Sequence, residues 1–216
     1  NIAWSKALPE TGQSTVVIKD GRLFYTCYQP LEADGELGSN IVAYCADAQT
    51  GDVLWQRKIR GQYPLRLSGC FSDSTSPPAV TDGERVCFFN ASGTLTCFDM
   101  QGDQLWSREA MAVGRSQPFL VHGNVVFTKQ TIMPKDGKFG HEHKDASQEL
   151  WTQLEALELA SGEHVWTSTC GVNMGAVPMV SRWSDGREVI VVGRGGGHSP
   201  PELSLIHISE PTRPRL

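Results

Sequence analysis

Two groups of polar residues in this chain could bind a ligand or a metal ion. The first comprises Asp73, Ser74 and Thr75, which offer a carboxylate and two hydroxyl groups, with Arg115 and Asn173 in later segments. These five residues are candidates for a ligand site if the fold brings them together. The alternative is that Asp73 and its neighbours only form hydrogen bonds within a turn.

The second group contains the candidate metal ligands His141 and His143, with Asp136 and Asp145 nearby in the sequence. Imidazoles at positions i and i+2 can face one side of an extended segment and bind a divalent cation, with a carboxylate as third ligand. The spacing permits a metal site without being diagnostic, because lysines in the same segment also favour a solvated loop. No nucleophile paired with a base is visible, so we assign no catalytic residue.

The composition argues against two kinds of partner. The chain has 216 residues, with 24 acidic and 19 basic side chains and a formal net charge of −5. An acidic chain without a block of basic residues is not typical of nucleic-acid binding. No apolar run approaches the roughly 20 residues of a transmembrane helix, so we expect no membrane span in this sequence. Proteins and small molecules remain as partners.

Tryptophan spacing reveals an internal repeat. Four tryptophans, at positions 4, 55, 106 and 166, are separated by 51, 51 and 60 residues. Each of the last three lies four residues after a glycine, and an acidic residue precedes that glycine. The three sets are Asp47, Gly51 and Trp55; Asp99, Gly102 and Trp106; and Glu158, Gly162 and Trp166. A period of about 50 residues is typical of a repeat architecture.

Short apolar runs between these markers predict four strands, A to D, in each repeat. The runs are rich in Val, Phe, Tyr and Thr and end in turn residues; they cover 15–18, 23–28, 41–45, 86–89, 95–98 and 125–128. Segment 150–159 has some helical spacing, but it occupies the repeat position of 41–45, so we predict a strand. The expected fold is all-β: a β-propeller fragment of four-stranded antiparallel blades, about three complete and part of a fourth.

The motif around each tryptophan resembles a known family. Residues 45–55, Cys-Ala-Asp-Ala-Gln-Thr-Gly-Asp-Val-Leu-Trp, resemble the Ala-x-Asp-x-x-Thr-Gly-x-x-x-Trp docking motif of pyrroloquinoline quinone (PQQ)-like propeller repeats. Residues 156–166 resemble it with Glu for Asp and Ser for Thr, and residues 97–106 with one position deleted. The resemblance covers 1–202 and implies that the tryptophan packs between neighbouring blades, above a small residue. It also implies a larger ring, of which this chain would be a truncated fragment; a four-bladed ring closed by residues 1–8 is the alternative.

The end of the chain differs from the repeats. Residues 203–213 look like the translation of a transposase adaptor used in sequencing libraries. We therefore expect 1–202 to form the propeller repeats and 203–216 to be a non-native tail. The chain starts without Met or a signal peptide, so any export signal would lie upstream.

The six cysteines contain no CxxC pair. Cys45 and Cys97 occupy the repeat position of Ala156, which predicts small buried side chains beneath the tryptophans. A bridge between Cys70 and Cys170 is an open alternative.

The resemblance implies a function as well as a fold. We expect a non-catalytic scaffold of an exported bacterial protein, periplasmic or secreted at the cell envelope, that binds a protein or small-molecule ligand. Its binding face would carry the long B–C and D–A connections, since long loops on a rigid scaffold commonly bind ligands. The alternative is part of a PQQ- and calcium-dependent quinoprotein alcohol or sugar dehydrogenase, although the adjacent Cys-Cys pair often found there is missing. A propeller attached to a further domain is a third possibility. We expect PQQ and calcium only under the dehydrogenase alternative.

Overall fold

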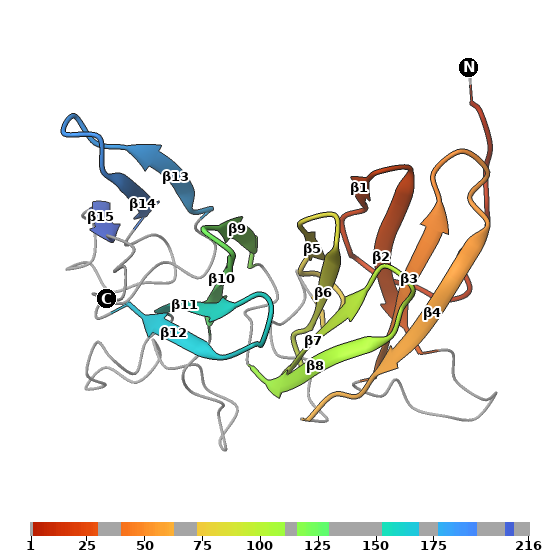
Figure 1. Ribbon diagram of the computed structural model, residues 1–216. Coiled ribbons are helices and arrows are strands. Elements are labelled where there is room, and N and C mark those ends of the chain that lie inside the picture. The colour runs from red at the N-terminus through yellow and green to blue at the C-terminus, as the bar shows by residue number, and fades with distance from the viewer. Residues whose placement is uncertain are drawn as a thin grey trace.

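The computed structural model describes residues 2–29, 40–62, 73–110, 116–129, 153–168, 177–193 and 206–209. In these ranges the chain forms four antiparallel sheets and no helix. The sheets follow one another along the chain as successive blades (Figure 1). None of the described segments is a helix long and apolar enough to cross a membrane.

Each blade is an up-and-down sheet whose strands pair in sequence order. Blade 1 contains β1 (Val17–Lys19), β2 (Arg22–Tyr28), β3 (Ile41–Asp47) and β4 (Val53–Ile59). Blade 2 contains β5 (Val80–Thr81), β6 (Arg85–Asn90), β7 (Thr94–Asp99) and β8 (Gln104–Glu109). Blade 3 contains β9 (Phe119–Val121), β10 (Asn124–Lys129), β11 (Gln153–Glu158) and β12 (His164–Thr167). Blade 4 contains β13 (Met179–Arg182), β14 (Glu188–Gly193) and β15 (Ile206–Ser209).

The predicted all-β propeller fold is confirmed: three sheets have four strands and the fourth has three. The ambiguous segment 150–159 contains the strand β11, as the repeat alignment predicts. Strand β15 lies in the segment expected to be a non-native tail, yet it pairs with β14 from Ile206 opposite Gly193 to Ser209 opposite Ile190. The boundary at residue 202 stays a prediction.

The hydrophobic core lies between blades. One cluster joins blades 1 and 2 and includes Phe24, Trp55 and Phe88. A second joins blades 2 and 3, where the rings of Phe89 and Phe127 lie 5.4 Å apart. A third joins blades 3 and 4. Because each sheet buries its faces against its neighbours, the stability of one blade depends on the blades beside it.

Candidate functional site

The most regular site in the molecule is the contact between one blade's tryptophan and the next blade. The Trp55 indole Nε1–H of β4 donates a hydrogen bond to the Met100 carbonyl oxygen at 3.0 Å. The same ring lies over Gly102, where a Cβ atom would be only 2.8 Å from the indole. A flat ring can approach the backbone this closely only where there is no side chain, so Gly102 is required for the contact.

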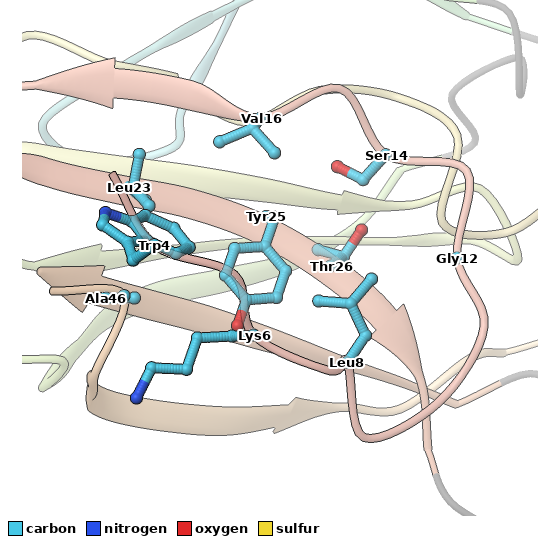
Figure 2. A pocket seen from close by; sticks show the side chains of 11 residues that line it. Trp4, Lys6, Leu8, Gly12, Ser14, Val16, Leu23, Tyr25, Thr26 and Ala46 are labelled. Carbon is cyan, nitrogen blue, oxygen red and sulfur yellow. The ribbon is translucent and has the colours of Figure 1, made fainter. Parts of the chain in front are cut away.

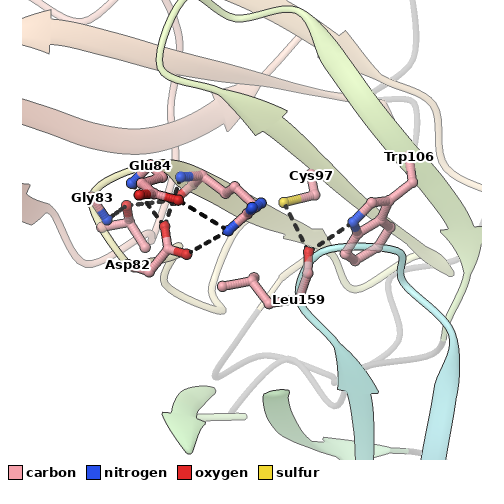
Figure 3. Close-up of polar contacts among 8 residues, drawn as sticks. Asp82, Gly83, Glu84, Cys97, Trp106 and Leu159 are labelled. Carbon is pink, nitrogen blue, oxygen red and sulfur yellow. Dashed lines mark hydrogen bonds and ion pairs between the residues drawn. The ribbon is translucent and has the colours of Figure 1, made fainter. Parts of the chain in front are cut away.

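The same contact recurs one blade later. Trp106 Nε1–H donates to the Leu159 carbonyl oxygen at 2.9 Å (Figure 3), and a Cβ on Gly162 would lie 2.7 Å from its ring. Trp55 and Trp106 are 8% and 9% exposed. A buried indole that satisfies its N–H on a neighbouring sheet combines apolar burial with a directional bond.

The N-terminal segment carries a third copy of this contact. Trp4 Nε1–H donates to the Ala48 carbonyl oxygen at 3.2 Å, and a Cβ on Gly51 would lie 2.7 Å from its ring. Lys6, two residues further on, forms an ion pair with Asp52 at 2.8 Å. Segment 2–8 thus contacts blade 1 as β4 contacts blade 2.

The acidic residue of each motif shapes the turn that presents the glycine. Asp47 Oδ1 accepts hydrogen bonds from the backbone N–H groups of Gln49 and Thr50 at 2.8 and 2.9 Å. In the same way, Asp99 Oδ1 accepts from residues 101 and 103. Glu158 departs from this pattern, because its carboxylate accepts a bond from the Ser161 hydroxyl. These side chains hold turns in which the motif glycines adopt φ values of +72 to +84°.

Two arginines complete the contact, and our sequence reasoning missed them. Arg57 Nε donates to the Gly102 carbonyl oxygen at 2.7 Å, and its guanidinium lies 5.9 Å from the Trp55 ring centroid. Arg108 donates from Nη1 to the equivalent carbonyl oxygen, that of Gly162. The signal that could have found them is the spacing Trp-x-Arg, present at 55–57 and 106–108.

The candidate ligand residues Asp73, Ser74 and Thr75 are buried, at 8%, 1% and 0% exposure. Asp73 Oδ1 accepts hydrogen bonds from the backbone N–H and the hydroxyl of Thr75, at 2.8 and 2.6 Å. The Ser74 hydroxyl lies 2.5 Å from that of Ser92. Here the structure shows the turn hydrogen bonds of the alternative interpretation. Arg115 and Asn173 lie outside the described residues, so a shared ligand site stays a prediction.

The same turn also connects two blades. Thr75 Oγ1 accepts a hydrogen bond from the backbone N–H of Gln13 at 2.8 Å, and Thr26 on β2 donates to the Thr75 carbonyl oxygen at 3.0 Å. The segment that leads into blade 2 is therefore bonded to blade 1 and to the N-terminal segment. Its polar groups stabilise a junction between blades.

A cavity of about 200 Å³ lies between the N-terminal segment and blade 1 (Figure 2). Its wall is mostly apolar, and it is lined by Trp4, Lys6, Leu8, Gly12, Ser14, Val16, Leu23, Tyr25, Thr26, Ala46 and Gly51. Tyr25 stacks on Tyr44 with ring centroids 5.0 Å apart. The volume is below the roughly 300–1,000 Å³ of typical ligand pockets.

One protein-family model matches the part of the chain that contains the tryptophan contacts. A family model described as outer membrane protein assembly factor BamB matches residues 2–168. The chain belongs to this family. The BamB-family match confirms the resemblance to PQQ-like repeats on which the fold prediction rested. No curated protein matches the chain significantly.

Two alcohol dehydrogenases of known structure share the fold of this BamB-family chain. A europium-containing methanol dehydrogenase matches with a TM-score of 0.53 and 13% identity, over 78% of this chain and 27% of that one. A quinohemoprotein alcohol dehydrogenase from Comamonas testosteroni has a TM-score of 0.53 and 12% identity, over 84% and 32%. BamB from Moraxella catarrhalis has a TM-score of 0.47 and 14% identity, over 88% and 48%. The chain spans less than half of each of these structures.

No metal site is found among the residues that the structure describes in this BamB-family chain, where no three His, Cys, Asp or Glu side chains come together. His141 and His143 lie outside those ranges and stay a prediction.

Three aspartates in tight turns or at blade contacts have lowered pKa values. For Asp82, burial opposes ionisation, but the backbone N–H groups of Glu84 and Arg85 and the Arg85 guanidinium donate to its carboxylate and hold the pKa down. Asp52 and Asp185 are exposed; the Lys6 ammonium lowers the pKa of Asp52, and the backbone N–H and guanidinium of Arg187 lower that of Asp185.

Asp73→Ala is expected to lower the free energy of unfolding of this BamB-family chain by about 2 kcal/mol, because two buried hydrogen bonds to a carboxylate are lost. Urea denaturation followed by tryptophan fluorescence measures the change. The matched control is Asp103→Ala, at an exposed position, which should change stability by less than about 0.5 kcal/mol. Equal losses in the two variants would contradict a structural role for the Asp73 turn.

Cys27 gives a prediction about pH. Burial, and secondarily the negative charge of Glu10, raise the pKa of the Cys27 thiol to about 11. Because this pKa exceeds the ordinary thiol value of about 8.5, deprotonation favours the unfolded state, and stability should fall as the pH rises from about 8.5 to 11. Cys27→Ala should make that decline shallower. Denaturation midpoints of both proteins across this pH range measure the difference; identical slopes would show that Cys27 does not contribute.

Proposed function

We propose that this chain is part of a non-catalytic β-propeller scaffold of the bacterial cell envelope that binds a protein or small-molecule partner. The observation that carries the proposal is the match of residues 2–168 to a family described as an outer membrane protein assembly factor. Assembly requires that partners be held in a fixed arrangement. A rigid array of blades with variable connections provides such a surface.

The geometry of the blades favours one face for the partner. Since strands alternate in direction, the connections β2–β3, β4–β5, β6–β7, β8–β9, β10–β11 and β12–β13 all leave from the same side of the array. The opposite side has tight turns, as at Asp20-Gly21 and His122-Gly123, where both residues of each turn have positive φ. We call the side that carries the β2–β3 and β4–β5 connections the long-connection side. Described side chains there, such as those of Arg60 and Gln62, are exposed. We therefore place the binding surface there.

Site-specific photo-crosslinking tests which face binds a partner. A photoreactive residue is introduced at Arg60 or Gln62 on the long-connection side, and at Val53 or Leu54 on the opposite part of β4 as matched exposed controls. The proposal requires one and the same envelope protein to be crosslinked from positions 60 and 62 but not from 53 and 54. Crosslinking from the control positions alone would refute this assignment of the face.

A dehydrogenase is the second candidate, and the fold it shares with two alcohol dehydrogenases favours it. Under this hypothesis the chain would be part of a PQQ- and calcium-dependent alcohol or sugar dehydrogenase. Titration with PQQ and Ca²⁺, followed by quinone absorbance and dye-linked alcohol oxidation, separates the two candidates. The scaffold proposal predicts neither saturable binding nor oxidation. Saturable binding accompanied by oxidation would replace it with the dehydrogenase.

A further inference from the structure

Two cysteines face each other inside blade 2. Cys87 on β6 lies directly opposite Cys97 on β7 in the antiparallel register. Both are 0% exposed thiols and belong to the core cluster that contains Trp106. Residues directly opposite on antiparallel strands have Cα atoms about 4.5–5.5 Å apart, which is within the roughly 4.4–6.8 Å that a disulfide spans.

The Cys97 side chain also affects the ionisation of Cys87. The pKa of Cys87 is raised well above its usual value, first by burial and then by the neighbouring Cys97 side chain. Cys97 Sγ in turn lies 4.0 Å from the Leu159 carbonyl oxygen, the same atom that accepts the Trp106 N–H (Figure 3). Both thiols therefore point toward blade 3, beneath the docking tryptophan.

The repeat itself does not require this pair. In blade 1 the equivalent positions hold Phe24 opposite Cys45, and in blade 3 they hold Val126 opposite Ala156. The fold thus accepts an apolar residue on the second strand and a small one on the third. The other described cysteines face different residues, since Cys27 lies opposite Val42. Among the blades that the structure describes, blade 2 alone has a cysteine at both of these positions.

We propose that Cys87 and Cys97 form a cross-strand disulfide bond when this chain folds in an oxidising compartment. An S–S bond forms as the two thiols lose two protons and two electrons, and the electrons reduce a disulfide of a thiol–disulfide oxidoreductase or of oxidised glutathione to two thiols. The biological setting rests on the proposed envelope location, where disulfides persist. The chemistry depends only on the register of β6 and β7.

Burial determines when the bond can form. In the folded blade both sulfurs are inaccessible, and the raised pKa of Cys87 keeps its reactive thiolate scarce. The bond therefore forms while the β6–β7 hairpin is still open to the oxidant, before blade 3 packs over it. Once formed, it links the two central strands below Trp106 and restricts the unfolded chain.

Peptide mapping tests the bond directly. The protein is folded with oxidised glutathione, its soluble fraction is denatured and alkylated with iodoacetamide, and then it is digested with trypsin. Residues 86–108 form one tryptic peptide that contains both cysteines and no internal Lys or Arg. We expect this peptide to be unalkylated and lighter by two hydrogen atoms than the reduced form. Recovery of the doubly alkylated peptide would overturn the proposal.

Variants taken from the other repeats provide a second test. The double variant Cys87→Val, Cys97→Ala carries the residues of blade 3, and Cys45→Ala is the matched buried control. Wild type and Cys45→Ala should show a lower denaturation midpoint with reductant than without, whereas the double variant should show no such shift. An equal shift in the double variant would refute the bond. Neither result depends on which partner the scaffold binds, so this proposal and the proposed function can fail separately.

Discussion

Gly102→Ala is expected to lower the free energy of unfolding by about 2–5 kcal/mol, although it adds only one methyl group. The alanine would adopt a φ of +84°, and its Cβ would lie 2.8 Å from the Trp55 ring. The first effect costs about 1–2 kcal/mol and the second, which displaces a buried indole, about 1–3 kcal/mol. Denaturant unfolding followed by tryptophan fluorescence measures the total.

Gly21→Ala is the matched control for backbone conformation. Gly21 has a φ of +74°, and no atom lies within 4 Å of the position of its added Cβ. The Gly21→Ala substitution should lower the free energy of unfolding only by the conformational cost, about 1–2 kcal/mol. The difference between the two variants measures the steric contact with Trp55. Equal losses would mean that the indole does not pack on Gly102.

Trp55→Ala is expected to destabilise the protein by about 3–5 kcal/mol, through loss of a buried aromatic side chain. The indole lies between the two sheets, with ring centroids 6.0 and 5.8 Å from those of Phe88 and Phe98. Thermal unfolding monitored by circular dichroism measures the loss. Trp55→Phe keeps an apolar ring but removes the N–H bond to Met100, so its loss should be intermediate.

Trp183→Ala is the control for the tryptophan prediction. Trp183 lies in the turn between β13 and β14 and is 46% exposed. Its removal should change stability by less than about 1 kcal/mol, because little area is taken from the core. If Trp55→Ala cost no more than Trp183→Ala, the contact between blades would contribute nothing measurable to stability.

The sequence predicted the architecture because its main signal is repeated. One segment, 150–159, has an ambiguous local pattern, and its alignment with 41–45 identified it as a strand. Strand ends shift by one or two residues, as for β3, which continues from Cys45 to Asp47. Those two residues pair with β2 across the sheet, and pairing between strands is not visible in a local apolar pattern.

The candidate site was harder to predict, for a physical reason. Asp73 and Thr75 were recognised as polar residues before a strand, but the partners of Thr75 in blade 1 and the N-terminal segment, Thr26 and Gln13, lie some fifty to sixty residues away in sequence. The arginine contacts were missed because their acceptor is a backbone carbonyl of the next blade. Backbone acceptors have no residue signature, so only the repeated Trp-x-Arg spacing could indicate them.

The contact in which the tryptophan of one blade packs on a glycine of the next has an evolutionary consequence. Blades 1 and 2 each offer a tryptophan to the blade that follows and a glycine to the tryptophan of the segment that precedes, as Trp55 and Gly51 do in blade 1. A gene segment encoding one unit can therefore be duplicated or deleted in frame, and the flanking units still meet compatible surfaces. Mutations within one copy can then change its connections without altering the tryptophan–glycine contact between blades. Such a chain can change its number of units by recombination and acquire new specificities one copy at a time.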